Sequence, residues 1–172
     1  MKPQKKTKRF AQNPLRLLVR AFALWLNGRF RFERGLSDLT TKENGESFRA
    51  FRKVAVVGNA VSSESPAAIF KVRFAFRNLS PKTNRILSLI PIPFIAAQPG
   101  FRSKTWLLGG SSGDFMGIYE FDTVADAEAY WNSLPLRMMR RRAAVGSLCC
   151  RISGPRGAEG LRIVGPGTAT CG

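Results

Sequence analysis

The chain has 172 residues, of which 44% are hydrophobic, so it can bury one core in a compact domain with extensions. It contains no histidine, which removes the commonest general base, the usual haem-iron ligand and the commonest metal ligand. Its formal net charge of +17 favours polyanions or anionic membrane surfaces as partners.

The three cysteines, Cys149, Cys150 and Cys171, match neither a zinc-site spacing nor an even disulfide framework. Cys149 and Cys150 are adjacent, and neighbouring residues of a strand point to opposite faces. We therefore do not expect these two cysteines to pair with each other, and we expect a reducing, cytoplasmic setting.

The first predicted element is a helix from about Pro14 to Asn27. Asn13 followed by proline is typical of a helix start, and Gly28 can end the helix. At 100° per residue, its basic residues fall on one narrow side. That polar side consists of Arg16, Arg20, Asn27 and Arg31, whereas Leu15, Leu18, Phe22, Trp25 and Leu26 cover most of the rest.

This pattern allows three interpretations. The helix packs its apolar surface on the main domain or on a second subunit. Alternatively, it lies peripherally at the inner membrane face, with Phe22 and Trp25 in the lipid and Arg16 and Arg20 at the headgroups. The third interpretation is a targeting segment, although Arg20 interrupts the apolar run that a secretory signal would need. The same run is too short to span a membrane.

Composition divides the chain into three zones. Residues 1–66 form a basic N-terminal extension with this helix and an extra strand at Val54 to Val57. Residues 67–153 form the main domain, which begins after a Ser-rich linker that ends at Pro66. Residues 154–172 form a tail rich in glycine and proline, for which loose packing is the default.

The main domain begins with a clean two-residue alternation, in which Phe70, Val72 and Phe74 alternate with Lys71 and Arg73. The expected elements are a strand at 70–76, a helix at 80–90, strands at 101–108 and 115–121, helices at 123–135 and 136–145, and a strand at 147–152. Prolines interrupt both helical regions. This order of elements indicates the fold much more firmly than the function.

Five short motifs occur in this region. They are Phe74-Ala75-Phe76, Gln98-Pro99-Gly100-Phe101, Lys104-x-Trp106, Gly117-Ile118-Tyr119-x-Phe121 and Ala127-x-Ala129-Tyr130. With these motifs, residues 69–153 resemble the YdhR-type monooxygenase family of the dimeric α+β barrel superfamily, which also includes antibiotic-biosynthesis monooxygenases. The extensions lie outside the match.

The resemblance implies an α+β fold, with a ferredoxin-like four-stranded antiparallel sheet and two helices on one face. The other face would be closed by a second subunit, giving a homodimer. Elementary packing agrees, because a sheet has two faces to cover and a symmetric copy can cover the second.

The first candidate site is polar. In the implied topology the third strand lies between the first and second, so we expect Glu120 beside Lys71 or Arg73 and beside Lys104. Glu120 would then act as a base, and Arg73 and Lys104 would bind an anion. The alternative is a set of cross-strand ion pairs at the subunit junction.

The second candidate site is aromatic. Its residues are Phe74, Phe94, Phe101, Trp106, Tyr119 and Tyr130. An apolar pocket with a phenol and an indole N–H suits an aromatic or polyketide-like substrate, with Trp106 and Tyr119 at the reacting centre. The alternative is that these are core aromatics, each with one satisfied polar tip.

The resemblance implies a cofactor-independent monooxygenase, or a small-molecule-binding protein, that acts on an apolar or aromatic ligand forming a stabilised carbanion. Whether the chain is an enzyme stays open, and so does flavin binding. Without histidine, haem degradation through a histidine ligand is disfavoured, and the scattered carboxylates predict no metal site.

The rival hypothesis is a non-catalytic dimer held at a membrane surface by its basic N-terminal helix. A second basic concentration, at Arg137 and 140–142, could join the N-terminal lysines in binding polyanions. No nucleic-acid-binding motif accompanies it, so we expect no sequence-specific recognition of nucleic acid.

Overall fold

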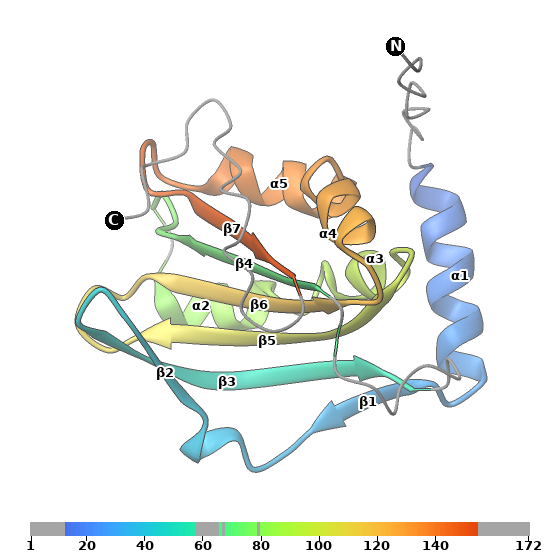
Figure 1. Cartoon of the computed structure of the whole chain (residues 1–172), viewed down its shortest axis with the longest axis horizontal. Coiled ribbons are helices and arrows are strands. Elements are labelled where there is room, and N and C mark those ends of the chain that lie inside the picture. The colour runs from blue at the N-terminus through green and yellow to red at the C-terminus, as the bar shows by residue number, and fades with distance from the viewer. Residues whose placement is uncertain (1–12, 58–65, 67, 79, 155–172) are drawn as a thin grey trace.

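The computed structural model of the chain describes residues 13–57, 66, 68–78 and 80–154, which form an α+β protein built on one antiparallel sheet (Figure 1). The N-terminal region contributes α1 (Pro14–Leu26), β1 (Phe30–Glu33), the 3-10 turn η1 (Leu36–Asp38), β2 (Thr40–Glu43) and β3 (Glu46–Val56). The remaining elements are β4 (Ala68–Phe74), α2 (Pro81–Leu87), α3 (Ile92–Ala96), β5 (Phe101–Gly109), β6 (Phe115–Phe121), α4 (Val124–Trp131), α5 (Leu134–Arg142) and β7 (Cys149–Ser153).

The four strands of the predicted main domain have the ferredoxin-like order β7–β4–β6–β5, and all neighbours are antiparallel. The prediction that the third of these strands lies between the first and second is confirmed. The prediction of a four-stranded sheet is wrong, because the described residues form seven strands. β3 pairs along the free edge of β5, and β1 and β2 both pair with β3.

Each predicted crossover helix is divided in two by proline. The predicted helix at 80–90 ends at Leu87, and α3 begins after Pro91. The second crossover consists of α4 and α5, with Pro135 in the first turn of α5. Hydroxyl groups cap both crossovers: the Ser80 and Thr123 side chains accept hydrogen bonds from backbone N–H groups at 3.2 and 3.1 Å.

One face of the sheet and the crossover helices enclose the main core. Phe70 and Val72 of β4 and Phe121 of β6 are fully buried there, and Ile95 of α3 and Leu136 of α5 pack against the same layer. Burying one such side chain contributes about 1.5–3 kcal/mol. This helix-facing layer therefore carries most of the stabilisation, and it also contains the cavity described below.

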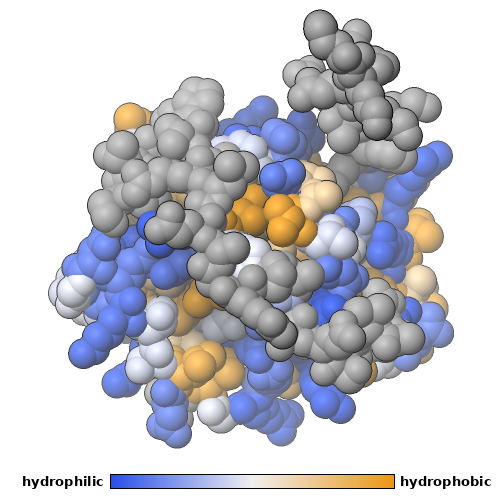
Figure 2. All heavy atoms as spheres, viewed as in Figure 1, coloured by the Kyte–Doolittle hydropathy of each residue, from blue (hydrophilic) through white to orange (hydrophobic). Residues whose placement is uncertain are grey.

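The β2–β3 hairpin folds across the opposite face of the sheet. Phe48 and Ala50 pack there against Leu107 and Met116, and Glu43 at the hairpin end pairs with Lys71 on β4 at 2.6 Å. A register shift between Ala50 and Arg52 turns the second half of β3 toward the helices. The chain thus covers part of this face with its own N-terminal region. Seen from the side of Figure 1, the surface is mainly hydrophilic, with hydrophobic residues in separate patches (Figure 2).

Candidate functional site

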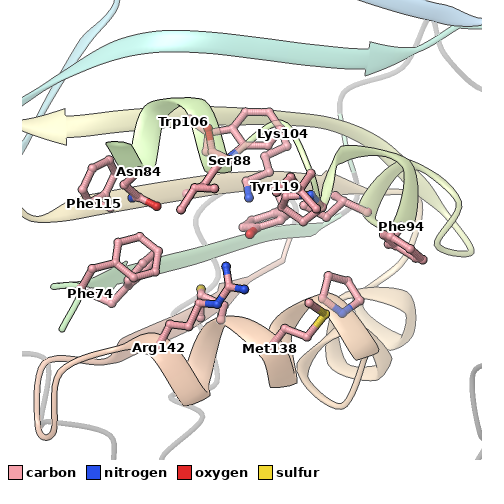
Figure 3. A pocket seen from close by; sticks show the side chains of 18 of the residues that line it. Phe74, Asn84, Ser88, Phe94, Lys104, Trp106, Phe115, Tyr119, Met138 and Arg142 are labelled. Atoms are coloured by element: carbon pink, nitrogen blue, oxygen red, sulfur yellow. The ribbon is translucent and has the colours of Figure 1, made fainter. Parts of the chain in front are cut away.

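A cavity of about 100 Å³ lies between the helix-facing side of the sheet and the crossover helices. One wall comes from β4, β5 and β6, and the other from α2, α3, α4 and α5. Its lining includes Phe74, Asn84, Ser88, Phe94, Lys104, Trp106, Phe115, Tyr119, Tyr130, Met138, Met139 and Arg142 (Figure 3). The structure therefore brings together five of the six residues of the predicted aromatic site.

Aromatic rings form one end of this cavity. The rings of Phe74 and Phe115 stack with centroids 6.3 Å apart, and Phe76 meets each of them edge to face, at 4.7 and 5.4 Å. Phe51 of β3 closes this group behind Phe115 at 6.2 Å. Such a wall offers flat apolar surfaces on which an aromatic ligand can stack.

Trp106 and Tyr119 form the opposite end, around Lys104. The Lys104 side-chain nitrogen lies 4.1 Å from the Trp106 ring centroid and 4.4 Å from that of Tyr119. In the β5–β6 pair, Lys104 is opposite Tyr119 and Trp106 is opposite Gly117. Because Gly117 has no side chain, the Tyr119 ring can lie close to the strand backbone there: a Cβ atom on Gly117 would be 2.8 Å from Tyr119 Cε2.

Lys104 is only 6% exposed, and none of the ion pairs formed by the described residues involves it. Burial lowers its pKa well below the usual value, and the nearby positive charge of Arg52 lowers it further. Arg52 itself donates a hydrogen bond to the Ser88 hydroxyl. The pKa of Arg52 is lowered by burial and then by Arg85. Positive charge therefore gathers at the cavity, and no carboxylate of the described residues lines it.

Tyr119 and Tyr130 form a buried pair with ring centroids 4.8 Å apart. Burial raises the pKa of both phenols above their usual value. The two hydroxyl groups interact with each other, and both belong to the wall of the cavity. Neighbouring Cys150 is a free thiol whose pKa is raised to about 12, mainly by burial. As predicted, it does not pair with Cys149.

Sequence reasoning missed three polar groups at the cavity. Asn84 is 4% exposed, and its side-chain amide has no hydrogen-bond partner among the described residues. Ser88 lies one helical turn further along, and Arg142 reaches toward the cavity from α5 (Figure 3). The available signal was Asn84 itself, because asparagine is unfavourable inside a helix unless its side chain has a use.

The predicted polar site is not assembled. Glu120 faces the side of the sheet opposite the cavity, where it accepts a hydrogen bond from Ser103 at 2.7 Å. Arg73 lies on that same side and pairs with both Glu46 and Asp114 at 2.9 Å. The prediction that Glu120 lies beside Lys104 is therefore wrong.

The cause is a register shift between Phe101 and Ser103, which places Lys104 on the helix-facing side. Phe101 is also outside the cavity: it packs on Phe121 with ring centroids 6.1 Å apart and lines a different hollow, beneath α1. The alternation of β6 itself, with Ile118 and Glu120 on one face and Tyr119 on the other, is as predicted.

Helix α1 packs on the rest of the molecule through a narrow stripe. Leu17 and Ala21 are buried against Ala97 and Phe94 at α3. The predicted membrane-binding residues point elsewhere: Phe22 and Trp25 are 58% and 63% exposed, and Arg16 and Arg20 are also exposed. Within the described ranges, no helix is long and apolar enough to cross a bilayer.

Comparisons with known proteins give no family. No family model matches the sequence, and no curated protein matches it. The crystal structure of LmHde, a heme-degrading enzyme from Listeria monocytogenes, is similar with a TM-score of 0.49 and 12% identity, over 66% of this chain and 73% of that one. An anthrone oxidase-like protein has a TM-score of 0.44 and 15% identity, over 69% of this chain and 60% of that one.

Proposed function

We propose that this protein binds a one-ring aromatic molecule in the cavity and oxidises it with molecular oxygen, as a cofactor-independent monooxygenase. The observation that supports the proposal is the cavity, which has flat apolar rings at one end and Trp106, Tyr119 and Lys104 at the other. Its volume of about 100 Å³ is below the roughly 300–1,000 Å³ of drug-sized sites and closer to an engineered cavity of about 150 Å³ that binds benzene. One ring is therefore the expected size.

The reaction we propose needs no external reductant. The substrate loses a proton from an activated position, and the resulting carbanion reduces O₂ and forms a carbon–oxygen bond. The oxygen–oxygen bond then breaks. One oxygen atom replaces two substrate hydrogens as a carbonyl group, and the other leaves with those hydrogens as water. The substrate supplies all the electrons. The chain therefore has only to bind the substrate, orient it toward O₂ and exclude water from the cavity.

Two groups have direct roles in this scheme. Trp106 lines the cavity, and its indole would pack against the substrate ring and fix its plane. Tyr119 donates its hydroxyl proton to the oxygen on which negative charge develops. Its raised pKa keeps that hydroxyl protonated at neutral pH, as this role requires.

Oxygen uptake tests the proposal. We expect the wild-type chain to consume O₂ with one-ring phenols that this reaction converts to quinones, such as resorcinol, above the rate without protein. Trp106→Phe and Tyr119→Phe should lower this rate by about tenfold or more. Trp131→Phe is the matched control, because Trp131 packs on Phe70 and Arg140 outside the cavity lining. No protein-dependent uptake across a broad panel, with no binding of a neutral aromatic such as 4-nitroanisole, would contradict the proposal.

A second function is favoured by α1: attachment to an anionic membrane surface. Six large apolar residues of this helix are more than two-fifths exposed and form a continuous arc beside the stripe that packs on α3. They are Leu15, Leu18, Val19, Phe22, Trp25 and Leu26. Arg16 and Arg20 flank this arc, and the sequence has no acidic residue before Glu33. Apolar insertion and attraction to anionic headgroups then act together.

Vesicle sedimentation tests this second function with the full chain. We expect co-sedimentation with vesicles of phosphatidylcholine and phosphatidylglycerol, weakening as salt is added. The double variant Phe22→Ser with Trp25→Ser should lower the affinity by about tenfold or more. Val145→Ser, which changes an exposed apolar residue elsewhere, should bind like the wild type. Equal binding by the double variant would show that α1 is not the membrane contact.

We also propose a homodimer through the face of the sheet opposite the helices. Ile69 of β4 and Ile118 of β6 remain half-buried on that face, where Ile118 packs at the edge of the cluster formed by the hairpin, and a symmetric copy would cover the surface they leave exposed. Sedimentation velocity at micromolar concentration should show a species of twice the chain mass. A single stable subunit at that concentration would contradict the dimer.

A further inference from the structure

The geometry points to a specific ligand class: an aromatic molecule with an acidic hydroxyl group, whose proton passes to Lys104 and whose oxygen then pairs with the resulting ammonium group. This inference rests on the proposed function, because it assigns the chemistry of the ligand in the same cavity. In this scheme Lys104, and not Glu120, is the base. Glu120 lies on the other face of the sheet, bonded to Ser103.

No carboxylate of the described residues pairs with the Lys104 side chain. This side chain is 6% exposed, and its nitrogen lies between the faces of Trp106 and Tyr119. The aromatic faces attract a cation but accept no proton and carry no net charge. None of the described residues' ion pairs or hydrogen bonds satisfies the nitrogen, and Figure 3 shows it pointing into the cavity. A buried amine in this state needs a partner from outside the chain.

The surroundings select an acidic partner. The guanidinium groups of Arg52 and Arg142 approach the same region, whereas no carboxylate among the described residues lines the cavity. A ligand cation would be repelled there, and a neutral ring would leave the amine without a partner. Asn84 adds a second unsatisfied polar side chain, 4% exposed, which can bond another polar substituent of the ligand.

The proton balance is simple. The uncharged amine of Lys104 accepts the hydroxyl proton, so the oxygen–hydrogen bond breaks and a nitrogen–hydrogen bond forms. The products are an ammonium group and an aryl oxyanion in contact, and the net charge of the complex is unchanged. Burial and Arg52 both lower the pKa of Lys104, which increases the uncharged fraction of the amine that can accept this proton. The oxyanion in turn activates the ring toward oxygen.

The test uses 4-nitrophenol, whose phenolate absorbs visible light, and its methyl ether 4-nitroanisole, which has no acidic proton. At a pH where free 4-nitrophenol is protonated, titration with the wild-type chain should produce a saturable phenolate band. Displacement of the band by 4-nitroanisole would place the chromophore in the shared cavity rather than on the basic surface. Lys104→Met keeps an apolar side chain of similar length and should abolish the band while 4-nitroanisole still binds.

Two further variants sharpen the result. Lys104→Gln should also abolish the band. This result would show that the loss does not come from the way a methionine packs at this position. Lys82→Met removes an exposed lysine and should leave the band unchanged. The expected difference between Lys104→Met and Lys82→Met is at least about tenfold in the bound phenolate.

The failures are distinguishable. If 4-nitrophenol binds without a phenolate band, and binds Lys104→Met equally well, the acidic-ligand inference is overturned while the aromatic cavity stands. A band that persists in both Lys104 variants overturns the role of Lys104. If neither nitroaromatic binds, the proposed function itself fails, and this inference fails with it.

Discussion

Gly117 lies directly opposite Trp106 in the β5–β6 pair, and the Tyr119 ring lies over its backbone, which forms the floor of the cavity beside the indole. A Cβ atom at Gly117 would lie 2.8 Å from Cε2 of Tyr119 and 3.3 Å from Cγ1 of Val72. The size of the cavity therefore depends on a glycine in the middle of a strand, where glycine is otherwise unfavourable.

Gly117→Ala should accordingly displace the Tyr119 ring and shrink the cavity. We expect a loss of about 1–3 kcal/mol in the free energy of unfolding, from overpacking, and weaker binding of 4-nitroanisole. Chemical denaturation and ligand titration measure the two effects. Gly110→Ala is the control, since its nearest atom would be a backbone oxygen at 3.7 Å. A Gly117→Ala chain that binds and unfolds like the wild type would contradict this description of the cavity floor.

The lowered pKa of Lys104 predicts a pH dependence of stability. Between that lowered pKa and the usual 10.5, the unfolded chain holds more protons than the folded chain, so the free energy of unfolding should rise with pH. Lys104→Met should lose this rise and should be more stable than the wild type at low pH, because it removes a buried charge. Denaturation across a pH series measures both. The control Lys82→Met should keep the wild-type slope.

Glu46 fixes the turn between β5 and β6 and makes stability rise with pH in a separate, acidic range. One of its carboxylate oxygens accepts hydrogen bonds from the Ser112 N–H at 2.8 Å and from the hydroxyls of Ser111 and Ser112 at 3.0 and 2.7 Å. The other oxygen pairs with Arg73 at 2.9 Å. The backbone hydrogen bond from Ser112 is the largest cause that lowers its pKa from 4.5 to about 2.

Its stabilisation should be complete above pH 4.5 and disappear as the pH falls toward 2. Glu46→Gln should therefore cost about 1–2 kcal/mol at neutral pH and little near pH 2, as measured by denaturation in acid and neutral buffers. Glu128→Gln, at an exposed helical position, should change neither value. An equal loss at both pH values would show that packing, not charge, stabilises the turn.

Phe48 tests whether the N-terminal strands belong to one cooperative unit with the main domain. It is fully buried against Leu107 and Met116, and the Arg73 guanidinium covers its ring at 5.0 Å. Phe48→Ala should cost about 3–5 kcal/mol and shift a single unfolding transition. Phe32→Ala, at a half-exposed ring on β1, should cost far less. Two separate transitions would show instead that the extension unfolds on its own.

Local patterns were enough to predict much of the fold. The alternation around Phe70 and Phe74 and the caps at Asn13, Ser80 and Thr123 all correspond to observed elements. The length of β3 was not predictable in this way, because its register shift between Ala50 and Arg52 breaks the two-residue period. The sequence therefore showed only the end of that strand, at Val54.

The sequence was enough to predict which residue types form the candidate site. It was not enough to predict on which face of the sheet each side chain lies. Trp106 and Tyr119 were expected in an aromatic pocket, and they line the cavity. Lys104 was expected beside Glu120, but the shift after Phe101 reverses its direction. Asn84 gave too weak a signal, since its role depends on a helix position that only tertiary packing defines.

The most direct measurement is methyl NMR of the chain labelled at methionine and titrated with 4-nitroanisole. Met138 and Met139 of α5 line the cavity, and an aromatic ring bound there would shift their methyl signals through its ring current, whereas the Met116 side chain packs with Phe48 on the opposite face of the sheet. We expect the Met138 and Met139 signals to move saturably with one common dissociation constant and to move much less in Gly117→Ala, while the Met116 signal serves as the internal control and moves little. Unchanged methyl signals at concentrations where the ligand is shown to bind would contradict the account, because the aromatic molecule would then be bound somewhere else.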